Sequence, residues 1–239
     1  MTRINILGVG IDAMTESEAV DWVASAIAEK DPRHVVTVNP EFVMRARHDQ
    51  AFRDVVARAD LCLPDGVGVI WAARRQGQPL PERIAGVDLT QALARRGARS
   101  GWRFFLLGAA PGVAEAAAAA LIRDSPGLQI AGCLAGSPAT AADAELARAV
   151  RAAKTDILLV AYGAPIQELW IARNLWATGA MVAIGVGGAF DFLSGRVRRA
   201  PRWMRQHGLE WLYRLGQEPW RWHRMLALPQ FVLAVVTRR

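Results

Sequence analysis

Few residues of this chain could form a disulfide framework or a metal site. The sequence contains only two cysteines, Cys62 and Cys133, and both lie in apolar runs, which predicts buried reduced thiols. The four histidines lack the spacing of metal ligands, and no D-x-D motif for a divalent cation is present. We therefore expect neither a metal site nor a cofactor.

The chain also lacks long apolar segments. Its N-terminus has no apolar stretch typical of a secretory signal, so we expect a cytoplasmic protein. The last apolar run, Met225–Val236, contains Pro229 and is shorter than the ~20 residues that span a bilayer. With 52% hydrophobic and 21% charged residues, the chain is globular and can bury one sizeable core.

Acidic residues are scarce only at the C-terminal end. Residues 1–195 contain 19 basic and 20 acidic side chains, whereas residues 196–239 contain ten arginines and only Glu210 and Glu218. The whole excess of positive charge therefore belongs to the C-terminal segment, which also holds four tryptophans. We predict an α/β domain over residues 1–195 and a helical, basic and aromatic appendage over residues 196–239, called the tail below.

Short apolar runs alternate with helical patterns along residues 1–195. The expected strands are Ile4–Val9, His34–Val38, Ala59–Leu63, Arg103–Leu107, Gln129–Gly132, Ile157–Tyr162 and Ala180–Gly185. Helices are expected between them, including helical segments over Glu41–Arg58 and a helix capped by Asp65. The alternation predicts an α/β fold, with a Rossmann-like, mainly parallel sheet and helices on both faces.

Two glycine-rich segments resemble phosphate-binding loops. Gly8-x-Gly10-x-x-Ala13 fits the dinucleotide pattern, but the best helix cap, Thr15, lies beyond it, which favours simple turn glycines. A nicotinamide-dependent oxidoreductase nevertheless stays an alternative on this motif. The loop at residues 108–112 leads into a helix, and an anion cradle and a plain strand–helix turn explain it equally well.

Polar side chains follow four of the expected strands at the point where each strand ends. They are Thr37 and Asn39, Asp65, Gln167, and Asp191. Because the carboxyl ends of parallel strands meet at one edge of a sheet, these side chains should lie in one crevice. Each also has a local explanation, since Asn39 and Asp65 are good turn and capping residues. Gly187 and Gly188 would let a ligand approach the backbone closely.

The tail combines arginines with apolar side chains. On one continuous helix, Arg214, Arg221 and Arg224 would share a stripe. Tryptophans and leucines beside them are typical of a helix in the plane of a membrane interface. A helix packed on the domain with a solvated arginine face is the simpler alternative. A non-catalytic protein with a basic arm for nucleic acid is another.

The strand-end residues and the tail carry a family resemblance. The motifs are Thr37-x-Asn39-x-x-Phe42, Ala59-Asp60 with Leu63-Pro64-Asp65-Gly66, Arg83, Gly163-x-Pro165-x-Gln167-Glu168 and Gly185-Val186-Gly187-x-x-Phe190-Asp191. The tail adds Ala200-Pro201-x-Trp203, Gly208-Leu209-Glu210-Trp211-x-x-Arg214-Leu215 and Glu218-Pro219-x-Arg221. Over nearly its full length the chain resembles the WecG/TagA/CpsF glycosyltransferases, glycosyltransferase family 26.

The resemblance implies an inverting, metal-independent glycosyltransferase of the GT-E fold, peripheral on the inner face of the cell membrane. Such enzymes move a sugar from a UDP-sugar to a polyprenyl-diphosphate-linked sugar during assembly of teichoic acid or other surface polysaccharides. N-acetylmannosamine, its uronic acid and glucose are all open as the donor sugar. The expected partners are therefore these two substrates and an anionic membrane surface bound by the tail, without nucleic acid. The sequence slightly favours a homo-oligomer formed through the apolar surface that the tail covers.

The chemistry of glycosyl transfer agrees with these residue types. A carboxylate can take the proton of the attacking hydroxyl, and arginines suit a departing diphosphate because their geometry is bidentate. By the resemblance, Asp65 is the base. We assign Asp65, Thr37 and Gln167 to catalysis. Substrate binding is assigned to Asn39, Arg83, Tyr162, Gly187, Gly188, Asp191, Arg214, Arg221 and Arg224.

Overall fold

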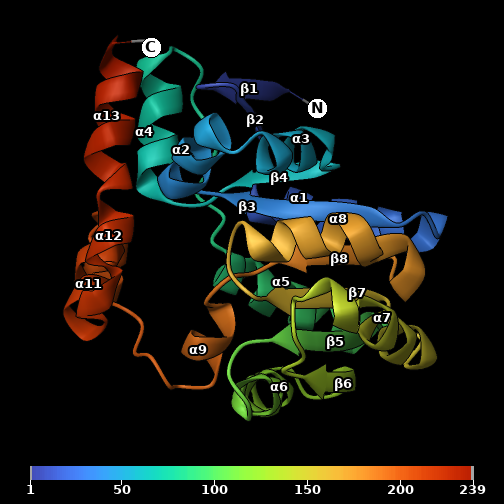
Figure 1. Cartoon of the computed structure of the whole chain (residues 1–239). Helices are drawn as coiled ribbons and strands as arrows, with labels where there is room; N and C mark the ends of the chain where they lie inside the picture. Colours follow the sequence, from blue (N-terminus) through green and yellow to red (C-terminus); the bar gives the residue numbers. More distant parts are fainter. Residues whose placement is uncertain (1, 238–239) are drawn as a thin grey trace.

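A six-stranded parallel sheet forms the centre of the fold, with strand order β4-β3-β8-β7-β5-β6 (Figure 1). This computed structural model describes residues 2–237, apart from the side chains of residues 202, 206 and 221. The strands are β3 (Arg33–Val38), β4 (Leu61–Pro64), β5 (Arg103–Gly108), β6 (Gln129–Leu134), β7 (Ile157–Ala161) and β8 (Val182–Gly185). Each contains an apolar run expected from the sequence.

Helices connect the strands and cover both faces of the sheet, which confirms the predicted α/β fold. They are α1 (Glu16–Glu29), α2 (Pro40–His48), α3 (Gln50–Arg58), α4 (Val67–Arg75), α5 (Gly86–Ser100), α6 (Val113–Asp124), the 3₁₀ turn η1 (Thr140–Ala142), α7 (Asp143–Ala152), α8 (Ile166–Thr178) and α9 (Ala189–Leu193). Because successive side chains of a strand point to opposite faces, uninterrupted apolar strands are stable only under two such layers.

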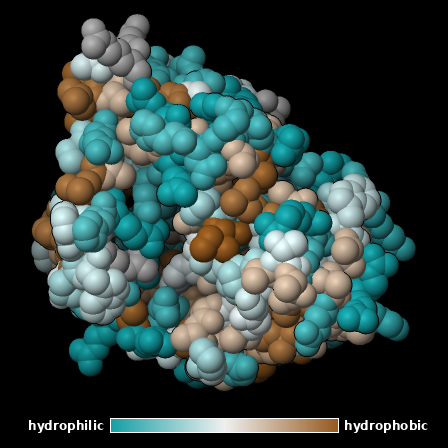
Figure 2. Space-filling view, viewed as in Figure 1, coloured by the Kyte–Doolittle hydropathy of each residue, from teal (hydrophilic) through white to brown (hydrophobic). Residues whose placement is uncertain are grey.

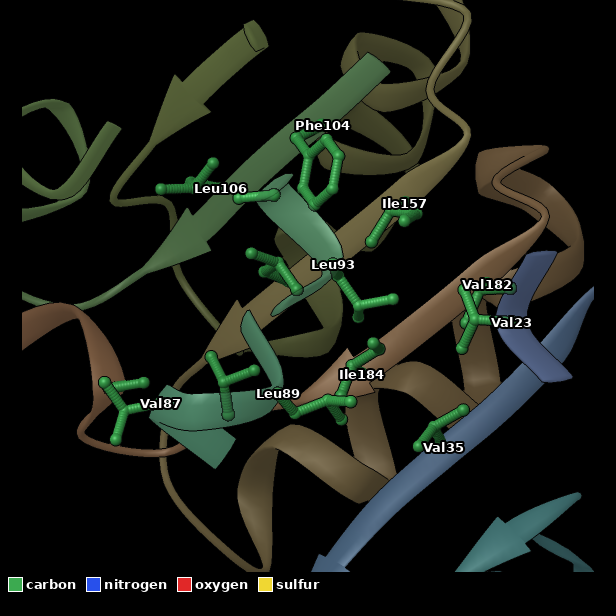
Figure 3. Packing of buried hydrophobic residues seen from close by; sticks show 14 of the residues in the cluster. Val23, Val35, Val87, Leu89, Leu93, Phe104, Leu106, Ile157, Val182 and Ile184 are labelled. Carbon is green, nitrogen blue, oxygen red and sulfur yellow. The ribbon is translucent and has the colours of Figure 1, made fainter. Parts of the chain in front are cut away.

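Strand β5 shows how the two layers share one strand. Phe104 and Leu106 point into the larger cluster, with α1, α5 and α6 (Figure 3). Phe105 and Leu107 point into the opposite cluster, with α7 and α8. No residue of the tail belongs to the larger cluster as far as the structure describes it. The α/β body therefore has a core of its own.

The first expected strand, Ile4–Val9, is wrong as a member of the main sheet. This segment instead forms an antiparallel hairpin of β1 (Arg3–Ile6) and β2 (Val9–Asp12), separate from the parallel strands. Gly8 lies in the turn at φ 93°, a conformation that a residue with a Cβ rarely adopts. The glycines therefore turn a hairpin and do not lead a parallel strand into a helix. The dinucleotide motif has no structural support here.

The helical segments expected after β3 are present, whereas the helix start expected at Asp65 differs. The helical segments over Glu41–Arg58 divide at Asp49, whose carboxylate accepts from the N–H of Phe52 at 3.1 Å and caps α3. The expected capping role of Asp65 is wrong, because α4 begins after Gly66 and has no side-chain cap. The carboxylate of Asp65 is therefore available for other chemistry.

The tail folds back along one side of the body (Figure 1). Its elements are α10 (Arg202–Gln206), α11 (Glu210–Gln217), the 3₁₀ turn η2 (Pro219–Arg221), α12 (Trp222–Met225) and α13 (Ala227–Thr237). The single continuous helix expected for the arginines is wrong, because the chain breaks at Glu218 and Pro219. Within residues 2–237, no helix has the length and apolar character needed to cross a membrane.

The tail is held partly by apolar contacts. Helix α13 packs against α2 and α4, and the side chain of Phe231 is only 1% exposed. Phe231 belongs to the apolar cluster that also contains the N-terminal hairpin. The domain boundary at Gly195 stays a prediction, but the tail and the body share this cluster.

Candidate active site

A cleft of about 430 Å³ opens at the carboxyl ends of four neighbouring strands, β4, β3, β8 and β7. The tail forms its other wall, and the surface is hollowed between the two parts (Figure 2). Nearly all side chains assigned from the sequence line this strand-end cleft. They are Thr37, Asn39, Asp65, Arg83, Tyr162, Gln167, Gly187, Gly188, Asp191, Arg214 and Arg224. The expected meeting of strand-end residues is therefore observed, while their roles stay proposals.

Asp65 lies between β4 and α4. Its backbone N–H donates to the carbonyl oxygen of Val38 at 2.8 Å, which ties its loop to β3. Burial is the largest influence on its carboxyl group and raises the pKa to about 6. The nearby charge of Arg83 lowers this pKa, and that of Glu210 raises it. A carboxylate with a pKa just below neutrality can accept a proton from a substrate hydroxyl and later release it.

Four charged side chains join the tail to the body beside Asp65. Arg83 donates to Glu210 of α11 at 3.1 Å. Arg199 donates to both carboxylate oxygens of Asp88 on α5, each at 2.6 Å, and to Glu210 at 3.3 Å. Bidentate arginine–carboxylate pairs fix both distance and orientation. This network therefore sets the position of the start of α11 over Asp65.

Thr37 and Asn39 follow the end of β3 toward the cleft. The hydroxyl of Thr37 donates to the carbonyl oxygen of Gly185 at 3.3 Å, across to β8. The amide oxygen of Asn39 accepts from the N–H of Phe42 at 2.9 Å and caps α2. The capping explanation of Asn39 is thus correct for its oxygen. The NH₂ group of Asn39 has no hydrogen bond within the described part of the chain. It can therefore donate to a ligand in the cleft.

Gln167 ties together two loops of the cleft. Its amide oxygen accepts from the N–H of Gly163 at 2.9 Å and from that of Gly187 at 3.0 Å. Its NH₂ group donates to Glu168 at 2.9 Å, and Glu168 in turn lies 2.7 Å from the imidazole of His34. All three side chains are buried. Gln167 therefore ties the loops of Gly163 and Gly187 to each other and to Glu168, and its assignment to catalysis stays a prediction.

Sequence reasoning did not assign a role to His34 or Glu168. Their pairing spans 134 positions of the chain, and no local pattern reports it. One signal was present: Gln167 and Glu168 are adjacent polar residues at the start of a helix that otherwise buries tryptophan and isoleucine. Two neighbouring polar side chains on a buried turn need partners, because unpaired buried polar groups are costly.

Arg214 of the tail reaches the glycine loop of the cleft. Its guanidinium lies against Gly188, where any Cβ would collide with it, and 4.7 Å from the ring centre of Phe192. Nε donates to Glu218 at 2.8 Å, and Nη2 lies 4.0 Å from the carboxylate of Asp191. Nη2 is buried and has no hydrogen-bond partner within the described residues. The N–H groups of this Nη2 are therefore free to bind an anion beside the glycine loop.

The structure places Arg224 at the cleft but does not describe the side chain of Arg221. Arg224 donates to Glu41, in the first turn of α2, at 2.7 Å and lines the cleft. The side chain of Arg221 lies outside the described residues, so its assignment to substrate binding stays a prediction. Arg214 and Arg224 thus reach one cleft from different helices, not from one helical stripe.

Tyr162 contributes to the cleft wall, but its hydroxyl is buried against Gly136. Burial raises the pKa of this phenol to about 12, so it stays protonated. Its hydroxyl has no hydrogen-bond partner within residues 2–237. The loop at residues 108–112 is not among the cleft residues, which favours its explanation as a plain turn.

Groups that could bind a metal are absent from the described part of the chain. Those residues contain no set of three or more histidine, cysteine, aspartate or glutamate side chains that could hold a metal ion. Both cysteines are free, Cys62 fully buried and Cys133 half-buried. Arginines and the backbone N–H groups of the glycine loops are the types of group that bind anions in this cleft's lining.

Comparison with known proteins matches this architecture to one family. The family model for the glycosyl transferase WecG/TagA/CpsF family matches residues 4–239. An N-acetylglucosaminyldiphosphoundecaprenol N-acetyl-beta-D-mannosaminyltransferase of Bacillus spizizenii is 39% identical over 202 residues, covering 84% of this chain and 78% of the relative. Its Staphylococcus aureus counterpart is 31% identical over 238 residues, covering 98% and 92%. The chain thus belongs to the WecG/TagA/CpsF family of glycosyl transferases.

Proposed function

We propose that this glycosyl transferase moves an N-acetylmannosaminyl group from a UDP-linked donor to an N-acetylglucosaminyl lipid diphosphate of the undecaprenol type. The names of the relatives supply the sugar and the acceptor, and the likeness extends over 98% of the chain. The observation that carries the proposal is the position of Asp65, a carboxylate with a raised pKa, in a cleft that is also lined by arginines.

In the proposed reaction, Asp65 accepts the proton of the attacking acceptor hydroxyl. The hydroxyl oxygen then forms a bond to the anomeric carbon of the donor as the bond to the diphosphate breaks. The diphosphate leaves with the electron pair of that bond as UDP, and attack from the opposite side inverts the configuration. Thr37 and Asn39 lie on the neighbouring strand end, where they can orient the hydroxyls of a sugar.

The departing diphosphate needs positive charge or hydrogen-bond donors. Arg214 offers a buried, unbonded Nη2 beside Gly188, and Arg224 lies on the same cleft. A phosphate oxygen accepts strongly from such a guanidinium. We therefore assign the donor diphosphate to the Gly187–Gly188 loop and Arg214, with Gln167 holding that loop in place.

We further propose that the tail holds the enzyme on the inner face of the membrane, where a lipid-linked acceptor is found. Trp203, Trp220 and Trp222 are 57%, 69% and 52% exposed, and Leu233 of α13 is 64% exposed. Aromatic and apolar side chains beside arginines are typical of a helix at a membrane interface. Figure 2 shows apolar surface along the tail side of the molecule.

A donor screen tests this function directly. Release of UDP is measured from a panel of UDP-sugars with a short-chain prenyl-diphosphate-linked N-acetylglucosamine as acceptor. We expect UDP-N-acetylmannosamine to give the highest kcat/KM, above its uronic acid and UDP-glucose. Preference for another sugar would overturn the assignment of the donor. Release of UDP that does not depend on the acceptor would overturn the proposed transfer reaction.

A further inference from the structure

A second cavity, of about 580 Å³, lies beside the strand-end cleft, between helix α4 and the C-terminal end of α10 with the residue after it. We call it the α4–α10 cavity. Its basic lining side chains are Arg74, Arg83, Arg205 and His207. The described residues that line it include no aspartate or glutamate. This differs from the strand-end cleft, whose wall contains both signs of charge.

The arginines of the two cavities differ in their partners. In the cleft, Arg83, Arg214 and Arg224 each donate to a carboxylate within 3.1 Å. Arg205 has no such ion pair within the described residues, and its Nε is buried without a hydrogen-bond partner. Its charge does influence Asp88, but both oxygens of Asp88 already accept from Arg199. A buried unpaired donor on a charged group favours an anionic ligand that could satisfy it.

The rest of the lining is apolar. Val67, Ile70 and Trp71 lie on α4 together with Arg74, at the helical spacings i, i+3, i+4 and i+7. Residues at these spacings share one face of a helix. Val67 and Trp71 are each 38% exposed. The cavity therefore offers one face with an apolar strip and a basic end, which fits an anion attached to an apolar chain.

The α4–α10 cavity adjoins the cleft at Asp65. Val67 and Arg83 line both spaces. Arg83 is also the charged residue with the largest effect on the carboxyl group of Asp65. A sugar placed with one hydroxyl at Asp65 can therefore extend a charged substituent past Arg83 into this cavity.

We propose that the α4–α10 cavity binds the diphosphate of the lipid-linked acceptor, with the beginning of its apolar chain on α4. This inference rests on the proposed function and adds a location for its second substrate. Donor and acceptor each carry a diphosphate, and both must be bound when the sugar is transferred. Two diphosphates in one small site would repel each other, whereas two separate basic sites hold both substrates around Asp65.

Arg205→Ala and Arg74→Ala test the proposal in steady-state transfer without vesicles. We expect each variant to raise the KM for a short-chain lipid acceptor about tenfold or more, as the loss of a charge-assisted contact implies. The donor KM should change less than about twofold. Arg196→Ala is the matched control, because it removes an exposed arginine of the tail that lines neither cavity. Thermal unfolding of each variant verifies that it is folded.

Binding of a short-chain prenyl diphosphate, measured by calorimetry, tests the cavity independently of transfer. Weaker binding to the Arg205→Ala variant than to the wild type supports the proposal, even if no sugar is transferred and the proposed function fails. Unchanged binding and unchanged acceptor KM in a wild-type-like, active variant would overturn it. Reduced binding only to vesicles containing anionic phospholipid would also overturn it, because the cavity would then hold a membrane headgroup and not the acceptor.

Discussion

The two walls of the strand-end cleft are held by different forces. On the body side, Asp65, Asn39 and Gln167 are anchored through hydrogen bonds that involve the backbone. On the tail side, Arg214 and Arg224 are held by ion pairs with carboxylate side chains. Backbone anchors resist salt and ligands, whereas an exposed or half-buried ion pair is screened and can exchange partners. The body therefore presents a carboxylate fixed by backbone contacts, and the tail presents arginines whose ion-pair partners can exchange.

Removal of residues 196–239 is the strongest test of this division. We expect turnover with a soluble acceptor to fall by more than about 10⁴-fold, because several charge-assisted contacts, each worth about 1.5–3 kcal/mol, are lost together. The body should still fold, since the larger core cluster contains no described tail residue. Circular dichroism and thermal unfolding verify this. Full activity of the truncated chain on a soluble acceptor would show that the tail does not contribute to catalysis and serves only to bind the membrane.

Asp65→Asn removes the proposed base while leaving the tail intact. We expect kcat to fall about 10²–10⁴-fold, the usual contribution of general-base catalysis. UDP affinity, measured by calorimetry, should change little because Asp65 acts on the acceptor proton. Asp191→Asn is the comparison variant, since Asp191 lies near Arg214. If only Asp191→Asn abolishes turnover, the base has been assigned to the wrong carboxylate.

Glu168→Ala tests whether a residue that does not line the cleft positions the loops of the cleft. The variant leaves Gln167 and His34 without their buried partner, so the loops of Gly163 and Gly187 should shift. We expect kcat/KM for the donor to fall about 10–100-fold, the cost of a misplacement of order 1 Å. Glu115→Ala, an exposed first-turn glutamate of α6, is the control. A purely structural role would lower the Tm without this kinetic effect.

The pH profile compares the charges that body and tail bring to Asp65. Because the base must be unprotonated and its pKa is raised to about 6, kcat/KM should rise with pH through that value. Arg83→Gln should move this acidic limb to higher pH, and Glu210→Gln should move it to lower pH. Asp124→Asn, at an exposed position, should leave it in place. Shifts of the same sign in both variants would contradict this account.

Chelation should have the smallest effect. With arginines and loop N–H groups as the anion ligands, we expect activity in EDTA within about twofold of the untreated enzyme. The assay is UDP release before and after dialysis against the chelator. Loss of activity that Mg²⁺ or Mn²⁺ restores would show that a metal completes the diphosphate site.

Much of the body could be predicted from the sequence because its signals are local. Polar residues follow the apolar runs of β3, β4, β7 and β8, directly or after a short loop, and a parallel arrangement brings those strand ends to one edge. Thr15, the helix cap expected from the sequence, precedes α1 and forms a capping box with Glu18. At the N-terminus, where a local signal misled, a tertiary contact explains the difference. The hydrophobic segment at Ile4–Val9 satisfies its pattern equally well as a hairpin packed beside β4.

The sequence by itself determined which residues end the strands, and with them the fold class and the floor of the cleft. Only the tertiary structure decided that β4, β3, β8 and β7 are neighbours, that His34 pairs with Glu168, and that Arg214 lies on Gly188. The physical reason is the distance along the chain between the residues that interact. Periodicity and caps depend on a few adjacent residues, whereas an ion pair or a close backbone approach depends on how the whole core packs.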